Sequence, residues 1–483
     1  MDEDPNAGGR EIMDEPVGYF DLNIEEVLEH WPTSFAVREL IANALDEQAI
    51  TGTAAPVISK DGDAWVIRDF GRGVRYQHLT QNENPEKRRH DDVIGQFGMG
   101  LKDALAVFHR RGVEVMISSP YGDLSTSLRA KEGFPDIRTL HAGVAPPTRP
   151  DEPGTMIRLR GVTDDEVAAA QRYFLRYSGD RLLEQTRYGQ VLARPDGQPA
   201  NIYVKGLLVA QEENFLFSYN ITSLTQNLRQ ALNRERSNVG RGAYTDRVQA
   251  ILKQCGSADV ARPLAADLEN YRTGGMHDEL AWTEIKLHAC RVLASHEQVV
   301  FVTAGQLAFG GPQVEYAQEE GYRLVLVPDD LASKISKLQD LEGRPMLDLD
   351  AYREVWNDSF SFQFVDPADL TPAESKVYGL TELIIDAAGA EPARIGVDEI
   401  LISETMRLSE SGRTIYGLYD PVERRIVIRR DRLATPADYC GDLLHELTHA
   451  SSGYTDGTLD FEEALTEQLG MIMAELFKAG REV

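Results

Sequence analysis

Three polar residues recur at helical spacing in the segment 38–47. Glu39, Asn43 and Asp46 stand at i, i+4 and i+7, so a helix would project them from one stripe beside apolar neighbours. A carboxylate can orient and deprotonate a water molecule, and an amide oxygen one turn away is a hard ligand that suits Mg²⁺. The plain alternative is an amphipathic surface helix, and this segment alone favours that alternative.

A second group of residues follows the strand-like segment 64–68. Asp69 would emerge at the tip of that strand, where its carboxylate can accept a hydrogen bond from an exocyclic amine. Gly71 and Gly73 let the backbone turn closely past a flat ring, because they carry no side chain. These residue types suit a site for an aromatic ring that bears an amine.

Three glycines then precede a segment that is expected to be helical from about Leu101 to Phe108. Gly95, Gly98 and Gly100 would form a nest of backbone amides at a helix N-terminus, which suits phosphate oxygens. Lys102 adds a positive charge there. A glycine-rich stretch alone is a weak signal, but the order of these elements along the chain is a strong one.

With Gly154-Thr155 before the apolar alternation 156–159, the four stretches resemble the N, G1, G2 and terminal Gly-Thr motifs of the GHKL ATPases. That family includes gyrase B, the ninety-kilodalton heat-shock chaperone, histidine kinases and MutL. The resemblance covers about residues 25–162 and implies a two-layer α/β sandwich, the Bergerat fold, that binds ATP with Mg²⁺. It implies Glu39 as the general base for the attacking water and Asn43 as the Mg²⁺ ligand.

The resemblance also implies roles for the other motif residues. Asp69 would contact adenine, with Thr155 helping through water, and residues 76–94 would form a mobile lid over the nucleotide. Asp46 matches the family's acidic residue after the Asn, whose role is less uniform. The residues expected around the nucleotide are Asn43, Asp46, Asp69, Gly71, Gly73, Gly95, Gly98, Gly100, Leu101, Lys102 and Thr155.

The chain carries a second chemical motif near its end, His445-Glu446-x-x-His449 on a helix-like run. Two histidines one turn apart can hold Zn²⁺, and Glu446 would lie beside the metal to deprotonate its water. The plain alternative is a hydrogen-bonded histidine pair in a structural helix. The acidic helix that follows could supply a third ligand, and this layout resembles the gluzincin metallopeptidases.

The third zinc ligand is less determined by the sequence. Glu462 shares one helical stripe with Thr466 and Leu469 and is the first choice, with Glu463 second and Asp460 third. Upstream, residues 424–429 alternate like a strand. An edge strand beside the metal often holds an extended peptide in zincins, so a substrate could bind there by strand addition.

Composition limits the classes of protein to which the chain can belong. Its net charge of −28 opposes general nucleic-acid binding, although a local basic patch is compatible with that total. Its 3 cysteines form no CxxC pair and suit a reducing cytosol. An acidic N-terminus and the lack of a long apolar run predict a cytoplasmic protein with no membrane partner.

The expected fold class is α+β and multidomain, because the pattern of helices and strands changes several times along 483 residues. The predicted sections are a flexible acidic arm (1–17), the ATPase domain (18–162), a transducer-like α+β domain (163–274), a small α/β domain (275–365) and a mostly helical zincin-like domain (366–483).

The transducer-like section contains a basic run at 228–242. A solvated surface is one interpretation of that run. Residues 232–236 are also similar to a segment of the heat-shock chaperone's middle domain, where an arginine reaches the terminal phosphate of ATP. The sequence does not distinguish Arg234 from Arg236 for that role.

The preferred hypothesis is a nucleotide-gated peptidase, in which ATP binding and hydrolysis control a zinc-dependent peptidase that acts on a protein substrate. An ATP-dependent homodimer is expected by analogy with GHKL proteins. The alternative is a chaperone- or MORC-like clamp on a client protein or nucleic acid with a non-catalytic zinc site. A signalling kinase is a third hypothesis, which Glu39 disfavours because a kinase needs no base for water.

Overall fold

The computed structural model describes residues 16–22, 30–79, 93–94, 100–232, 239–409 and 412–479. The protein is a mixed α+β, multidomain chain that divides into two compact units. The first unit contains residues 1–264 and 276–289, and the second contains 265–275 and 290–483. Residues 1–15 of the predicted arm and 80–92 of the predicted lid lie outside the described residues.

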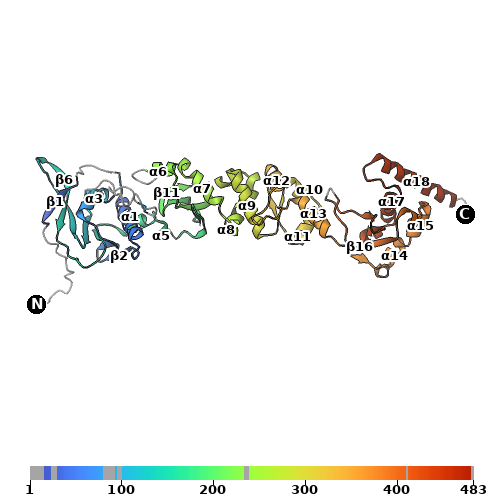
Figure 1. Cartoon of the computed structure of the whole chain (residues 1–483), viewed down its shortest axis with the longest axis horizontal. Helices are drawn as coiled ribbons and strands as arrows, with labels where there is room; N and C mark the ends of the chain where they lie inside the picture. Colours follow the sequence, from blue (N-terminus) through green and yellow to red (C-terminus); the bar gives the residue numbers. More distant parts are fainter. Residues whose placement is uncertain are drawn as a thin grey trace. The chain divides into compact units, whose positions relative to one another are not determined.

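The first unit begins with a seven-stranded antiparallel sheet (Figure 1). In spatial order its strands are β1 (Gly18–Asp21), β6 (Phe134–Ala145), β5 (Gly122–Lys131), β4 (Glu114–Ser119), β7 (Met156–Arg160), β3 (Ala64–Arg68) and β2 (Val57–Asp61). Ile67, Ile157 and Ile117 lie in register across β3, β7 and β4. Since side chains alternate along a strand, this apolar row faces one side of the sheet.

Helices α1 (Thr33–Thr51) and α3 (Gly100–Arg110) pack against each other, and their apolar residues share one core with that row. Helix α1 ends at Gly52, whose φ of 66° is a left-handed conformation that suits glycine. The predicted helix after the glycines is confirmed. The predicted loop 141–154 begins later than expected, because β6 continues to Ala145.

A five-stranded sheet follows in the same unit, with the order β11 (Leu207–Glu212), β10 (Ala200–Val204), β12 (Phe217–Ile221), β9 (Gly189–Ala193) and β8 (Leu182–Gln185). Strands β10 and β11 are the two arms of a hairpin. Lys205 and Gly206 both have positive φ, 50° and 80°, which is the conformation of a two-residue hairpin turn.

The helices in this part of the chain are α4 (Asp164–Gln171), α5 (Leu175–Ser178), α6 (Gln226–Ala231), α7 (Thr245–Leu252) and α8 (Ala258–Leu268). Helix α4 packs against α1, and residues 265–268 of α8 belong to the second unit. Helices α4 and α5 are separate, because Phe174 leaves the helical conformation to bridge to Leu207 of β11.

Residues 276–289 pack into the first unit, although the predicted boundary at residue 275 places them in the next domain. Glu279 is completely buried there. Its carboxylate accepts hydrogen bonds from the backbone N–H of Leu216 and Phe217 and from the hydroxyl of Tyr219. Burial raises the pKa of Glu279, and the donors offset part of that effect.

The second unit contains a small α/β arrangement. Parallel strands β13 (Val299–Val302) and β14 (Arg323–Leu326) pair. The helices in this part of the chain are α9 (Thr283–His296), whose residues 283–289 belong to the first unit, α10 (Ala304–Phe309), α11 (Pro312–Glu319), α12 (Asp329–Ile335) and α13 (Leu349–Ser359).

The last part of the second unit combines a four-stranded sheet with helices. The sheet order is β15 (Phe364–Val365), β16 (Glu399–Ser403), β18 (Arg425–Arg429) and β17 (Gly417–Asp420). The helices are α14 (Pro372–Tyr378), α15 (Thr381–Ala387), α16 (Pro392–Ile395), α17 (Pro436–Ser452) and α18 (Leu459–Ala479). None of the helices in the described ranges is both long and apolar enough for a membrane span.

Candidate functional site

Helix α1 carries the three polar residues that the sequence places on one stripe, and all three are at least partly buried. Glu39 is 2% exposed and Asp46 is 1% exposed, whereas Asn43 is partly buried. Ordinary surface-helix carboxylates would be solvated, so the surface-helix alternative is wrong. Arg38 donates a hydrogen bond from Nη2 to Glu39 Oε1 over 2.9 Å.

The start of α3 lies directly against Glu39. A Cβ added to Gly100 would come within 2.5 Å of Glu39 Oε2, so a side chain there would displace the carboxylate. Leu101 is partly buried, and Lys102 is almost buried, which lowers the pKa of its ammonium group. The structure thus brings the proposed base beside the beginning of the predicted phosphate-binding helix. Gly95 and Gly98 lie outside the described residues.

Asp69 follows β3 and is held by two backbone amides. Its Oδ1 accepts hydrogen bonds from Gly71 over 3.0 Å and from Thr155 over 3.1 Å. Thr155 Oγ1 in turn accepts the N–H of Val74 over 3.1 Å. Both amide bonds end on Oδ1, and Oδ2 keeps acceptor capacity that an exocyclic amine can use. Burial raises the pKa of Asp69, while the two amide donors lower it.

The turn after Asp69 requires its glycines. Gly73 has a φ of 86°, and a Cβ there would come within 2.8 Å of Pro120. A Cβ on Gly71 would overlap the Glu47 side chain, which accepts hydrogen bonds from the backbone and side chain of Arg72. The space beside each of these two glycines is therefore occupied by a side chain of the protein itself. Their close approach to a flat ring stays a prediction.

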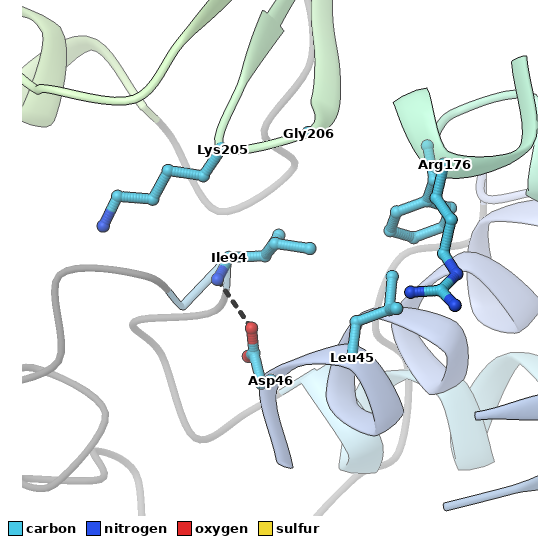
Figure 2. Close-up of a pocket in the computed structure, with 7 residues that line it drawn as sticks. Leu45, Asp46, Ile94, Arg176, Lys205 and Gly206 are labelled. Atoms are coloured by element: carbon cyan, nitrogen blue, oxygen red, sulfur yellow. Dashed lines mark hydrogen bonds between the residues drawn. The ribbon is translucent and has the colours of Figure 1, made fainter. Parts of the chain in front are cut away.

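A cavity of about 200 Å³ adjoins Asp46. Asp46 Oδ1 accepts the N–H of Ile94 over 2.6 Å. Lys205 and Arg176, which come from other elements, also line the cavity (Figure 2). Leu45, Phe174 and Gly206 complete its lining. Sequence reasoning missed both cations, although the Lys-Gly pair inside an apolar alternation is a recognisable turn signal. Arg234 and Arg236 lie outside the described residues.

The packing of α17 in the second unit positions the two histidines of the HExxH motif. Tyr439, Leu443 and Leu447 recur every four residues and are buried against Ile426 and Ile428 of β18. His445 and His449 therefore project from the other side of the helix. Gly453 ends the helix in a left-handed conformation, which turns the chain back toward them.

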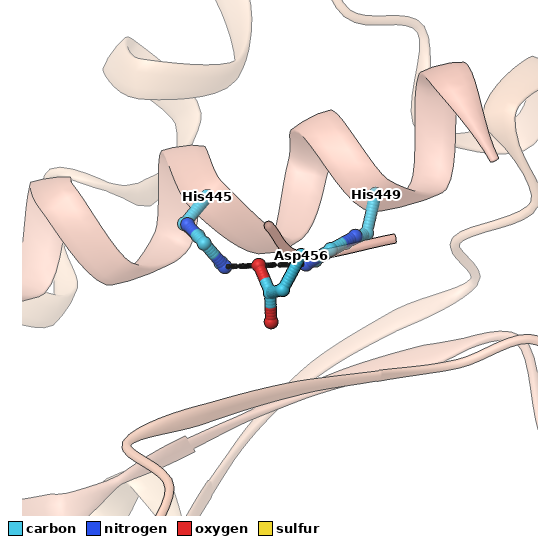
Figure 3. A group of neighbouring side chains, drawn as sticks. All are labelled: His445, His449 and Asp456. Atoms are coloured by element: carbon cyan, nitrogen blue, oxygen red, sulfur yellow. Dashed lines mark hydrogen bonds and ion pairs between the residues drawn. The ribbon is translucent and has the colours of Figure 1, made fainter. Parts of the chain in front are cut away.

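Asp456 joins the two histidines in a compact group, shown in Figure 3. The Nε2 atoms of His445 and His449 are 3.2 Å apart, and Asp456 Oδ1 lies 2.9 Å and 3.2 Å from them. Ligands at about 2.0–2.1 Å from a tetrahedral Zn²⁺ are separated by about 3.3 Å. The three atoms therefore fit one face of a zinc coordination sphere.

The ring orientation of His449 and the protonation state of His445 both suit a metal ligand. His449 Nδ1 lies 2.7 Å from the carbonyl oxygen of Tyr454. Because a carbonyl oxygen only accepts, Nδ1 must carry the proton, and the Nε2 lone pair faces the group. Burial lowers the pKa of His445, which favours the neutral form that binds metals.

The predicted third ligand needs correction. Glu462, Glu463 and Asp460 lie in the first turn of α18 and are exposed, and Asp456 occupies the place beside the histidines instead. The reason is Phe461, which is 4% exposed and stacks on the His449 ring at a centroid distance of 4.3 Å. Since Phe461 faces the histidines, its neighbour Glu462 points about 100° around the helix from them.

Glu446 is buried against strand β17. Its Oε2 accepts the N–H of Tyr419 over 2.8 Å, and a Cβ added to Gly417 would come within 2.7 Å of Oε1. Burial raises the pKa of Glu446 to about 8. The predicted strand at 424–429 exists as β18, but it lies between β16 and β17. The two edge strands are β15 and β17, and β17 is the one that packs against α17, so a peptide-binding edge beside the histidines would be Gly417–Asp420.

Comparison with known proteins identifies relatives of this chain, and the descriptions of these relatives name no activity. A family model described as the Mycoplasma pneumoniae MPN635 N-terminal domain matches residues 165–258. A Mycoplasma pneumoniae protein described as uncharacterized is 37% identical over 241 residues, which is 49% of this chain and 96% of the relative. The chain belongs to the family of this Mycoplasma protein.

A second member, also from Mycoplasma pneumoniae and described as uncharacterized, is 23% identical over 358 residues, or 70% of this chain and 99% of the relative. The segment that the family model covers runs from α4 into α8. It includes the five-stranded sheet and the Lys205-Gly206 turn beside the cavity.

Proposed function

We propose that this family member hydrolyses ATP in its first unit and cleaves a protein substrate at a zinc centre in its second unit, with nucleotide state gating the cleavage. The observation that carries the proposal is the convergence of His445, His449 and Asp456 within one coordination radius, next to Glu446. Two histidines with one carboxylate and an adjacent glutamate form a donor set typical of hydrolytic zinc enzymes.

The chemistry of the second unit follows from these residues. Zn²⁺ held by these residues would supply a Lewis acid for activating water and polarising a peptide carbonyl. Glu446 would accept the proton of the attacking water and return it to the leaving amine. Burial raises the pKa of Glu446 to about 8, so the ionised form that acts as base would depend on a cation bound beside it. Strand β17 would hold the substrate in an extended conformation along the part of its outer edge that is not bonded to Glu446, which accepts the N–H of Tyr419.

The first unit supplies the groups expected for a GHKL ATPase. Glu39 would act as base and Asn43 as the Mg²⁺ ligand, while Asp69 would bind adenine with Thr155. Lys205 and Arg176 line the cavity beside Asp46 and would contribute positive charge there. Arg234 or Arg236 would sense the terminal phosphate, as the sequence suggests. A homodimer formed on ATP binding and a protein client belong to the same proposal.

The test compares three nucleotide states. Cleavage of an unfolded protein such as casein is measured with Mg-ATP, Mg-ADP and no nucleotide, for the native protein, Glu39→Ala and Glu446→Gln. We expect cleavage to depend on nucleotide in the native protein, to lose that dependence in Glu39→Ala, and to vanish in Glu446→Gln with zinc retained. Equal rates in all three states would contradict gating while leaving each activity open to its own assay.

One observation favours the clamp alternative. Glu446 is buried and bound to the backbone of β17 rather than open to solvent, which also suits a non-catalytic zinc site. Native protein that holds zinc, cleaves nothing in any nucleotide state and retains a client or nucleic acid only with ATP would establish the clamp instead.

A further inference from the structure

Arg38 is an unusual residue because its whole side chain is buried. The side chain is 0% exposed, and its Nη2 lies 2.9 Å from Glu39 Oε1, whose own side chain is 3% exposed. Removing a guanidinium from water costs several kcal/mol unless partners replace the lost hydration. The partners of Arg38 therefore fix both its position and that of the carboxylate it contacts.

Three aromatic rings surround the guanidinium. Its central carbon is 5.7 Å from the ring centroid of Trp31, 4.6 Å from Phe35 and 5.3 Å from Tyr173. The rings also pack edge to face on one another, with Trp31 and Phe35 at 5.8 Å and Phe35 and Tyr173 at 5.5 Å. A desolvated cation over an aromatic face is attracted electrostatically by the ring. We call Trp31, Phe35 and Tyr173 the Arg38 cage.

Tyr173, one of the three rings of the Arg38 cage, lies in the segment that the family model matches. The carbonyl oxygen of Tyr173 accepts the N–H of Leu208 over 2.8 Å, and Gly206 accepts the N–H of Leu175 over 2.8 Å. Tyr173 is thereby fixed to the β10–β11 hairpin. The turn of that hairpin also carries Lys205, which lines the cavity beside Asp46.

We propose that Arg38 is a positioning residue for Glu39, and that Tyr173 ties this positioning to the β10–β11 hairpin. A shift of the hairpin would move Tyr173, loosen the cage and rotate the carboxylate away from the attacking water. Misplacement of a reacting group by about 1 Å costs up to about 100-fold in rate. This inference rests on the proposed ATPase activity and adds a connection between the base and the β10–β11 hairpin.

The test uses the full-length protein with four substitutions. Tyr173→Leu removes a cage ring, Tyr173→Phe keeps it, and Arg38→Met removes the cation. Tyr177→Leu is the matched control, since Tyr177 lies in the same segment but its ring packs on Phe174 at 6.4 Å. The measurements are kcat for Mg-ATP hydrolysis, Kd for Mg-ATP, and hydrogen–deuterium exchange of helix α1 without nucleotide.

We expect Tyr173→Leu to lower kcat by roughly three- to tenfold, the loss of one cation–aromatic contact, while Kd changes less than about twofold. Arg38→Met should lower kcat by at least about tenfold. Tyr173→Phe should restore the native rate, and Tyr177→Leu should keep it. Exchange in α1 should rise in Tyr173→Leu and Arg38→Met but not in the control.

Failure of the two proposals gives different results. A native protein that neither binds nor hydrolyses ATP overturns the proposed ATPase, and the exchange pattern then still decides whether the cage holds α1. Equal kcat in Tyr173→Leu and Tyr177→Leu, or equal α1 exchange in the two variants, overturns the positioning role of the cage.

Discussion

At the scale of single residues, the two candidate sites are built around buried carboxylates. Glu39, Asp69 and Glu446 are each less than 10% exposed, and each accepts a hydrogen bond from a neighbouring donor. Burial destabilises the charged form of a carboxylate unless such donors are present. A buried carboxylate therefore costs the protein more free energy than a carboxylate on the surface. Carboxylates of this kind gather at functional sites more often than elsewhere.

The third zinc ligand can be tested directly. Asp456→Ala should lower Zn²⁺ affinity by at least about 100-fold, because it removes an oxygen that lies within 3.2 Å of both histidine nitrogens. Glu462→Ala is the matched control, since Glu462 is exposed on the next helix, and it should retain affinity within about threefold. Competition with a zinc-chelating dye measures both. Normal affinity in Asp456→Ala together with a loss in Glu462→Ala would restore the ligand chosen from the sequence.

At the scale of elements, ion pairs fix the short helices around the four-stranded sheet. Arg430, directly after β18, donates to Glu374 of α14 over 2.9 Å and 3.0 Å and to Glu404 over 2.6 Å. Glu374 also accepts the N–H of Thr371 in a capping box. These bonds attach the beginning of α14 to the end of β18. Both elements also contact α17.

This attachment predicts a pH dependence. The Arg430 guanidinium, followed by the Thr371 amide, lowers the pKa of Glu374 to about 2 from an ordinary value of 4.5. A lowered carboxylate pKa stabilises the fold above the unfolded value and loses that contribution as pH falls through the folded value. The stability difference between the native protein and Glu374→Gln should therefore be complete at pH 7 and shrink between about pH 4.5 and 2.

Urea unfolding of the native protein and Glu374→Gln across this range measures the difference. Glu382→Gln, which changes an exposed carboxylate on the neighbouring α15, serves as the control and should differ little from the native protein at any pH. A Glu374→Gln difference that persists unchanged at pH 3 would show that the carboxylate charge does not contribute.

At the scale of the whole molecule, the chain passes between its two compact units more than once. Residues 265–275 belong to the second unit and 276–289 return to the first, where Asp278 accepts from Asn214 and Glu279 fills a buried polar site. The sequence placed the boundary at 274/275, which separates Glu279 from its donors. A boundary between units must instead follow the packing of this returning segment.

Two fragments test this boundary. Residues 1–289 should fold with a free energy of unfolding about 1–3 kcal/mol greater than residues 1–274, because the shorter fragment leaves the buried donors around Glu279 unpaired. Urea titration followed by circular dichroism compares them. Glu279→Ala in the longer fragment should reproduce most of the loss, and equal stability of the two fragments would favour the boundary drawn from the sequence.

The sequence by itself determined which residue types could do chemistry and on which local elements they stand. Helical spacing placed Glu39, Asn43 and Asp46 on one helix and His445 with His449 one turn apart on another, because local periodicity depends only on the backbone. The glycines before α3 and after β3 were also recognisable, since few other residues tolerate such close backbone approach.

Only the tertiary structure decided which distant residues meet. Asp456 rather than Glu462 joins the histidines because Phe461 packs on their rings, and β17 rather than β18 is an edge strand because strand order depends on long-range pairing. Lys205 approaches α1 from the turn of the β10–β11 hairpin, whereas Tyr173 and Arg176 approach it from the chain just before α5 and from α5 itself. Contacts of this kind arise from packing between elements far apart in the chain, and spacing along the sequence does not encode them locally.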